Sequence, residues 1–371
     1  MPPRETPFHQ VGLAAGAEMR DLFGYWLPWQ YEPGHEAEHR ATRERASLCD
    51  LDYMAEFKLT GPDSLRLAQH LFTNDFEDLA VGRVRYTAMC NADGNMIDDG
   101  TVWKLGPDEI VYISGDEEDF EWLQKNAEGF DVQLSNLTSE WTTLALQGPA
   151  SQQVLEQALS SDLGSLRYYG FMRADVAGVE CILARMGYTG ESGFELHFAP
   201  AHAETVWMAV MAAGEQSDIM PCGQAALESL RQEAGYLLVG NDHDKGTNPF
   251  EAGIGRVVKL NKPDFNGRQA LIDLLKQGLT RTMVWFRLES SAVVATGDAI
   301  RLDGQIVGTV TSGSYSPTLR RGVAMGYVEP SYAIQGATFD VDAESQSERA
   351  TLSVMPLYDP GDVRTTGRFA R

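Results

Sequence analysis

Two adjacent carboxylates, Asp98 and Asp99, stand in the run MIDDGTVWKL and could carry acid–base chemistry. The side chains of a strand alternate between its faces. We therefore expect Asp99 to share a face with Ile97, Thr101 and Trp103, and Asp98 to point to the other face. A carboxylate on an apolar face is costly unless it is paired or functional, and its pKa can be tuned for catalysis. The pattern predicts either a catalytic acid or a structural residue that ends a hairpin or pairs with an arginine.

A second pattern, His35-Glu36-Ala37-Glu38-His39, matches HExxH, in which two histidines on one helix face bind zinc. The helix expected over residues 34–48 is charged on nearly all sides, whereas a zinc-protease helix buries an apolar face behind the metal. No third ligand is apparent. We interpret the segment as a solvated surface helix and expect no metal.

The glycine-rich run GYTGESGFE, residues 187–195, lets the backbone turn tightly, and Glu195 follows it on an expected strand. It is neither a Walker A loop nor a dinucleotide fingerprint, because no Lys-Ser/Thr follows and no βαβ unit surrounds it. The tyrosines could also serve a site, since planar heterocycles bind well between aromatic rings. As an isolated pattern, the glycine-rich run favours an ordinary turn over a binding loop, and most tyrosines are simply half-buried packing residues.

Short strands and helices alternate irregularly around these residues. Strands are expected over 84–90 and 109–115, with the turn NADGN after the first, and helices over 116–127, 202–213 and 223–234. This mixture lacks the βαβ repeat of a doubly wound sheet and predicts an α+β fold. After about residue 278, short strands with Gly and Asp turns predict a separate all-β domain.

Composition narrows the classes of protein. A chain of 371 residues is too long to form one small core, so more than one domain is expected. Of its residues 43% are hydrophobic, as in ordinary globular proteins. A net charge of −23, with no basic patch, argues against nucleic acid and anionic membrane as partners. We expect neither a secretory signal nor a membrane span, since no apolar run reaches about 18 residues. Four scattered cysteines without a CxxC pair indicate reduced thiols in a cytoplasmic protein.

The segments YTAMCNADGNMIDDG, ALQGPASQ, GYTGESGFEL, SLRQEAGYLLVGNDHD, TNPFEAGIGRVVKLNK and TVTSGSYSPTLRRGVAMGYV occur in this order along the chain. Together they resemble the glycine-cleavage T-protein (aminomethyltransferase) family over nearly the whole sequence. The resemblance implies a three-domain cloverleaf around a folate site, with a β-rich, barrel or Greek-key C-terminal domain. The first domain would comprise residues 1–54 and 140–225. The second, interleaved with it, would comprise 55–139 and 226–277, and the third 278–371.

The resemblance also implies roles for single residues. Asp99 matches the catalytic aspartate of the family, and Glu195 the glutamate that hydrogen-bonds the pterin ring. The other residues that match cofactor-binding positions are Tyr86, Tyr168, Tyr169, Tyr236 and the retained Arg231. Three positions depart from the family pattern: Leu227 replaces an arginine, Tyr53 a histidine and Ser114 an asparagine.

The activity implied is transfer of a one-carbon unit onto N5 of tetrahydrofolate. An aminomethyl group would come from a lipoylated carrier protein. Alternatively, a small sulfonium, quaternary or N-methyl amine, or aryl O-methyl donor would be demethylated to give 5-methyl-tetrahydrofolate. The departures favour demethylation, whereas the intact IDD, TNPFEAG and SGSYSPT segments favour aminomethyl transfer. A third reading is a non-catalytic folate-binding scaffold, but GYLLVGNDHD lacks the KGCYxGQE-type motif of such relatives.

Overall fold

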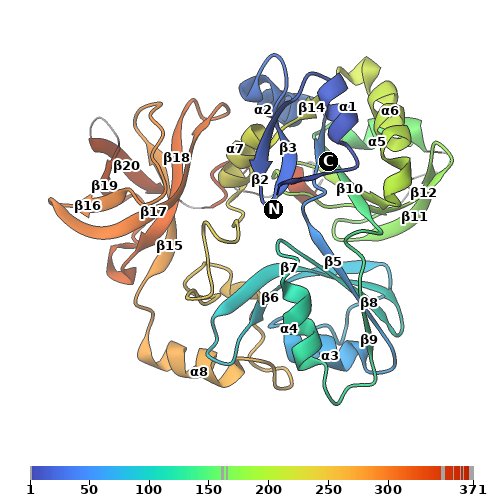
Figure 1. Ribbon diagram of the computed structural model, residues 1–371. Helices are drawn as coiled ribbons and strands as arrows, with labels where there is room; N and C mark the ends of the chain where they lie inside the picture. The colour runs from blue at the N-terminus through green and yellow to red at the C-terminus, as the bar shows by residue number, and fades with distance from the viewer. Residues whose placement is uncertain are drawn as a thin grey trace. The chain divides into compact units, whose positions relative to one another are not determined.

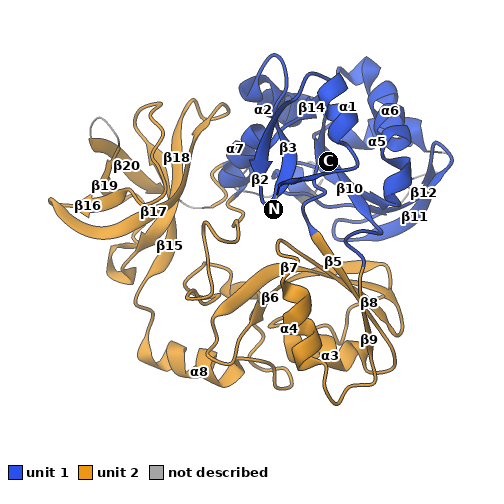
Figure 2. Cartoon of the chain, in the orientation of Figure 1, with its two compact units in different colours: residues 1–54, 137–234, 358–371 blue, residues 55–136, 235–357 orange. Residues whose placement is uncertain are grey.

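The computed structural model describes residues 2–159, 163, 166–343, 347–353, 355–359, 361 and 363–366. The chain folds as two compact units, and each is built from separated stretches of sequence (Figure 2). Unit 1 comprises residues 1–54, 137–234 and 358–371, and unit 2 comprises residues 55–136 and 235–357. The three-domain division expected from the sequence stays a prediction.

Unit 1 contains a six-stranded mixed sheet with the order β11-β12-β13-β10-β4-β14. Its strands are β4 (Ser47–Asp50), β10 (Thr142–Gln147), β11 (Phe171–Val176), β12 (Val179–Ala184), β13 (Gly193–Phe198) and β14 (Met220–Cys222). A small sheet precedes it, formed by β1 (Arg4–Glu5), β2 (Glu18–Leu22) and β3 (Tyr25–Gln30). The helices of unit 1 are α1 (His9–Ala14), α2 (His35–Glu44), α5 (Ser151–Ala158), α6 (Ala203–Ala213), α7 (Gln224–Ala234) and α9 (Val363–Thr366).

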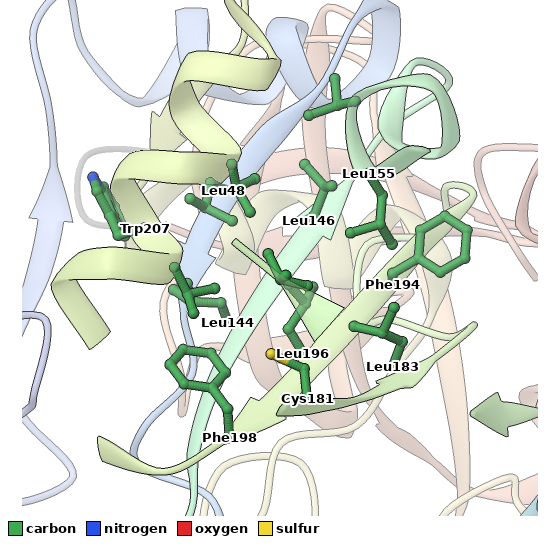
Figure 3. Close-up of a cluster of buried hydrophobic side chains, with 14 of the residues drawn as sticks. Leu48, Leu144, Leu146, Leu155, Cys181, Leu183, Phe194, Leu196, Phe198 and Trp207 are labelled. Carbon is green, nitrogen blue, oxygen red and sulfur yellow. The ribbon is translucent and has the colours of Figure 1, made fainter. Parts of the chain in front are cut away.

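Strand alternation gives this six-stranded sheet two different faces. Leu144 and Leu146 of β10 and Leu196 of β13 point to one face, where Leu155 of α5 and Trp207 of α6 cover them (Figure 3). Each such side chain contributes about 1.5–3 kcal/mol when it is fully buried. The residues between them point to the opposite face, which packs against α7. Glu195 therefore projects to the α7 side of the sheet.

Unit 2 begins with a five-stranded antiparallel sheet of order β6-β7-β8-β5-β9 (Figure 1). Its strands are β5 (Ala55–Thr60), β6 (Arg83–Cys90), β7 (Met96–Gly106), β8 (Glu109–Ser114) and β9 (Gln133–Asn136). Apolar residues of α3 (Ser64–Leu71) and α4 (Asp119–Asn126) cover one face. On the other face, Ala88 and Cys90 pack with residues of the long segment that includes Leu237, Ala252 and Ile254.

The rest of unit 2 contains α8 (Arg268–Gln277) and a closed six-stranded barrel of order β15-β18-β17-β16-β19-β20. Its strands are β15 (Thr282–Leu288), β16 (Ala299–Leu302), β17 (Gln305–Ser316), β18 (Arg321–Val328), β19 (Thr338–Asp342) and β20 (Ser347–Ser353). The short 3₁₀ turns are η1 (Pro200–His202) and η2 (Glu215–Ser217) in unit 1, and η3 (Gly255–Val257) and η4 (Pro330–Tyr332) in unit 2. The predicted α+β class and the β-rich C-terminal domain are confirmed. Among the described residues, no helix is both long and apolar enough to cross a membrane.

The prediction of a solvated surface helix over residues 34–48 is wrong in one respect, because α2 is partly buried against α7. Glu38 and His39 of the HExxH pattern are fully buried, and so is most of Arg43. The carboxylate of Glu38 accepts hydrogen bonds from the backbone N–H groups of Tyr31 and Gly223, the second at 2.8 Å. Charged residues can occupy this helix face because partners from other segments pair with them.

Candidate active site

The IDD run on β7 contains a β-bulge that sets the direction of its side chains. Asp98 pairs with Met89 and Met96 pairs with Cys90, so Ile97 is the extra residue between the two pairs. Ile97 consequently packs with the cluster under α3 and α4, and the prediction that it shares the face of Asp99 is wrong. Thr101 and Trp103 do lie together, since the Trp103 Nε1–H donates to Thr101 Oγ1 at 2.8 Å.

Asp99 accepts a hydrogen bond on each of its carboxylate oxygens. The Tyr86 hydroxyl on β6 donates to Oδ2 at 2.6 Å, and Nε2 of His243 lies 2.7 Å from Oδ1. The Asp99 side chain is 15% exposed, whereas the His243 side chain is fully buried. Tyr86 pairs directly with Thr101, so it reaches Asp99 diagonally across the ladder. One edge of the carboxylate thus stays open to solvent while both oxygens are held.

Asp98 is buried on the opposite face and serves the backbone. Its two oxygens accept hydrogen bonds from the N–H groups of Asp99, at 2.7 Å, and Gly115, at 3.0 Å. Burial raises the pKa of Asp98 well above its usual value, and the nearby Asp119 and Asp99 carboxylates raise it further. Burial likewise raises the pKa of Asp119 to about 7, although its hydrogen bond from Ser114 acts in the other direction. The neighbouring carboxyl groups of Asp98 and Asp99 therefore have different tasks: Asp98 binds backbone N–H groups, whereas Asp99 remains partly exposed.

The sequence patterns did not single out His243 as a partner of Asp99. It lies 144 positions further along the chain, in a segment without helix or strand periodicity. The Asn-Asp-His-Asp run in which it stands signals a turn, but a turn does not reveal what it faces.

Asp98, Asp99 and His243 each offer a ligand atom, and these atoms lie within 4.8 Å of one another, a spacing that a metal ion can occupy. All four carboxylate oxygens and Nε2 of His243 already take part in hydrogen bonds. The arrangement is a hydrogen-bonded network, and we assign no metal to it.

Glu195 in unit 1 has a very different environment from Asp99. Its side chain is 12% exposed, nearly as much as that of Asp99, but burial of the group raises its pKa to about 7. The described residues provide no hydrogen bond to it, and Nε2 of His197 lies 3.9 Å from one of its oxygens. A buried carboxylate without donors costs folding free energy, so this group is suited to a ligand that brings N–H donors.

The glycine-rich run before Glu195 is fitted around one amide side chain. A Cβ atom at Gly187 or Gly193 would collide with the side chain of Gln147. The Gln147 amide donates to Met186 O at 3.1 Å and accepts from the Thr189 hydroxyl at 2.9 Å. The glycines thus allow a tight turn that starts β13 and fixes the position of Glu195.

The structure divides the remaining predicted site residues between the two units. Tyr168 and Tyr169 lie in unit 1 with their rings edge to face, 4.6 Å between centroids. Arg231 is buried on α7 and donates from Nε to Glu228 at 2.9 Å. Tyr236 is half-buried at the start of the second stretch of unit 2. Their predicted role in cofactor binding stays a prediction.

Comparison with known proteins defines the class of the chain. Residues 8–262 match the model of the GCVT N-terminal domain, and residues 281–359 match that of the glycine cleavage T-protein C-terminal barrel domain. The aminomethyltransferase of Desulfitobacterium hafniense (strain DSM 10664 / DCB-2) is 36% identical over 96% of this chain and 98% of its own length. The aminomethyltransferase of Thermotoga maritima is 38% identical over 97% of this chain and 99% of its own length.

A solved structure agrees with these relatives. The glycine cleavage system aminomethyltransferase T from Bartonella henselae superposes with a TM-score of 0.88 and 27% identity, covering 95% of this chain and 98% of that one. The chain belongs to the glycine-cleavage T-protein family. It is a one-carbon transferase of the aminomethyltransferase type, and the predicted T-protein-like fold is confirmed.

Proposed function

We propose that this protein uses tetrahydrofolate to accept an aminomethyl group from a lipoylated carrier protein, with Asp99 as the catalytic residue. The observation that supports this proposal best is the Asp99 carboxylate, which is held on both oxygens by Tyr86 and His243 yet remains partly exposed. A carboxylate fixed in this way can orient an amine and stabilise positive charge that develops as carbon is transferred. The four buried free cysteines are consistent with a reducing cytoplasm.

The residues present fit tetrahydrofolate. Glu195 would hold the pterin, because its buried carboxylate needs donors and the pterin amino and ring N–H groups supply them. Half-buried Tyr53 and Tyr188 pack against the apolar cluster on the same side of the sheet, where aromatic rings can contact a planar ligand. When bound, tetrahydrofolate supplies the nucleophilic N5, and the protein supplies orientation and charge.

Demethylation of a small donor is the second candidate, and one observation favours it. Leu227, where the family resemblance expects an arginine, is a buried member of the apolar cluster with Cys49, Leu51 and Leu230. Tyr53, at the position of a family histidine, stacks on Phe23 with 4.9 Å between ring centroids. An apolar and aromatic environment at these two positions, in place of an arginine and a histidine, suits a small methylated donor.

Analysis of the folate product by mass separates the candidates. The protein is incubated with tetrahydrofolate and either an aminomethylated lipoyl carrier or a panel of methylated sulfonium, amine and aryl ether donors. We expect the carrier to give 5,10-methylene-tetrahydrofolate, with release of ammonia and of the carrier in its dihydrolipoyl form. Formation of 5-methyl-tetrahydrofolate from a small donor would replace the proposal with the second candidate. A protein that binds tetrahydrofolate but forms neither product would be a scaffold.

Asp99→Asn tests the role of the catalytic carboxylate. The amide keeps the size of the side chain but removes its charge, so we expect kcat to fall by about 10²–10⁴-fold. Affinity for tetrahydrofolate should change little, since Glu195 is assigned to the pterin. Calorimetry measures the affinity for tetrahydrofolate, and product analysis measures kcat. Full turnover by the variant would remove Asp99 from the chemistry.

A further inference from the structure

The imidazole of His243 is fixed on Asp99 in one orientation. Nε2 lies 2.7 Å from Oδ1, whereas Nδ1 is buried and has no hydrogen-bond partner among the described residues. A proton on Nδ1 would be a buried N–H without an acceptor, which costs about 1–3 kcal/mol, and more if the ring is charged. The arrangement therefore favours a neutral ring with its proton on Nε2, donated to Asp99.

The loop that carries His243 is anchored by its neighbour Asp242. The Asp242 Oδ2 accepts from Leu238 N at 3.0 Å and closes the loop, and Gly240 N donates to His243 O at 2.8 Å. The Asp242 Oδ1 accepts from the hydroxyls of Thr311, at 2.6 Å, and Ser312, at 2.7 Å. These two residues belong to β17, so the barrel fixes the loop.

A further hydrogen bond holds the backbone at the same point. The Tyr327 hydroxyl on β18 donates to Asp242 O at 2.7 Å. Asp242 is thus bound through its side chain and its carbonyl to two neighbouring barrel strands. Side chains that are locked by such supporting contacts give a site its precision.

We propose that His243 is a positioning residue for the one-carbon transfer. Neutral and anchored through Asp242 to the barrel, it donates its Nε2 proton to Asp99 and fixes the plane of the carboxylate. Tyr86 holds the other oxygen, so the carboxylate cannot rotate about its Cβ–Cγ bond without losing both hydrogen bonds. Each oxygen keeps a lone pair for the reacting amine. The part of this inference that concerns catalysis rests on the proposed function, but the structural part does not.

Nitrogen NMR of the unaltered protein, labelled with ¹⁵N-histidine, tests the structural part without any turnover. We expect the His243 ring to carry a proton on Nε2 and none on Nδ1. His243→Gln identifies the signals by their loss, and Asp99→Asn should shift the Nε2 resonance. A ring protonated on Nδ1, or on both nitrogens, would overturn the proposal even if the protein proves to be a transferase.

Kinetics of two variants test the positioning role. His243→Leu removes the donor, and we expect kcat to fall by about 10²-fold while KM for tetrahydrofolate stays within about twofold. His243→Gln retains an amide N–H near the place of Nε2 and should recover most of the loss. The matched control is His202→Gln at an exposed position of unit 1, which should leave both constants unchanged.

The outcomes are distinguishable. Equal losses in the Leu and Gln variants would mean that the histidine acts through packing alone and would overturn the proposal. An active His243→Leu variant together with an inactive Asp99→Asn variant would also overturn the proposal. If no substrate turns over in any variant, the proposed function fails, and the NMR result still decides whether His243 holds Asp99.

Discussion

Asp98 and Asp99 are chemically identical, and their different roles come from the two faces of β7. Asp98 faces the helix-covered side, where two backbone N–H groups donate to it, and burial raises its pKa. Asp99 faces the other side, where a tyrosine and a histidine hold it. One residue thus orders the backbone around the other.

Substitution of Asp98 separates its acceptor role from its charge. Asp98→Ala leaves two buried N–H groups without acceptors, so we expect a loss of about 2–4 kcal/mol in the free energy of unfolding. Asp98→Asn keeps one acceptor oxygen and resembles the neutral acid favoured by the raised pKa, so its loss should be about 1 kcal/mol. Unfolding in urea near pH 7, monitored by hydrogen exchange of β7 and β8, measures the loss in each variant. Equal losses would show that Asp98 is needed as an anion.

The pKa of Glu195, raised by burial to about 7, predicts how ligand affinity varies with pH. The group is protonated below that pH in the protein without ligand. If the ionised carboxylate accepts hydrogen bonds from the pterin, binding releases this proton. We expect affinity for tetrahydrofolate to rise about tenfold per pH unit up to about pH 7 and to level off above it.

Calorimetry in buffers of different ionisation enthalpy measures the affinity and the released proton together. Glu195→Gln is the control: it should bind more weakly and show no such slope. A slope that persists in the Gln variant would assign the titration to another group. In the absence of ligand, the raised pKa means that stability falls as pH rises from about 4.5 to about 7, because the unfolded state loses the proton first.

At the scale of the element, α2 shows how a charged helix becomes part of an interior. Arg43 donates to Glu233 of α7 from Nη2 at 2.8 Å and to Thr189 O at 2.7 Å. His39 contacts the same glutamate, at 3.2 Å, and its Nδ1 lies 2.7 Å from Ser229 Oγ. The paired charges hold α2 against α7, the helix on the side of the sheet to which Glu195 projects.

Two arginines on α2 provide a matched comparison. Arg43→Met removes one partner of a buried pair and leaves Glu233 without its guanidinium, so we expect a loss of about 3–5 kcal/mol. Arg40 pairs with Glu36 on the exposed side of the same helix, and Arg40→Met should cost about 0–1 kcal/mol. Hydrogen exchange of α2 and α7 in urea reports the stability of this region. Similar losses for both variants would mean that the buried network does not stabilise unit 1.

The elements also show what could be predicted from the sequence. Periodicity and turn residues predicted the helices near 202–213 and 223–234, because these signals are local. Burial of α2 could not be predicted, since its partner Glu233 lies 190 positions away from Arg43. The bulge at Ile97 depends on the register with β6, and the position of His243 depends on contacts with β17 and β18. Asp99 could be singled out from the sequence because alternation and the family resemblance agreed on it, and its catalytic role stays a prediction.

At the scale of the whole molecule, the chain returns to unit 1 after the barrel. Within the segment that follows residue 357, Arg364 donates to Glu191 at 3.1 Å and to Arg43 O at 2.9 Å. Thr365 donates to Gly190 O at 2.9 Å. These contacts join the end of the described chain to α2 and to the glycine-rich turn that begins β13.

A truncation after Leu357 tests how far unit 1 depends on this segment. Removing it leaves Glu191 with Arg43 alone and exposes Gly190 O, so we expect faster hydrogen exchange in α2 and over residues 187–195. Exchange in the barrel strands should stay unchanged, and Arg364→Ala should give a milder form of the same result. Uniform destabilisation of both units, or no change in unit 1, would contradict this expectation.

The order of strands in the sheet of unit 1 has a consequence for synthesis on the ribosome. Strand β4 lies between β10 and β14, which follow it by roughly 90 and 170 residues. At about 5–20 residues per second, β4 emerges roughly 5–18 s before its first neighbour and 9–34 s before its second. During that time both of its edges lack native partners, so the nascent chain offers unpaired strand edges to which chaperones or other nascent chains can bind.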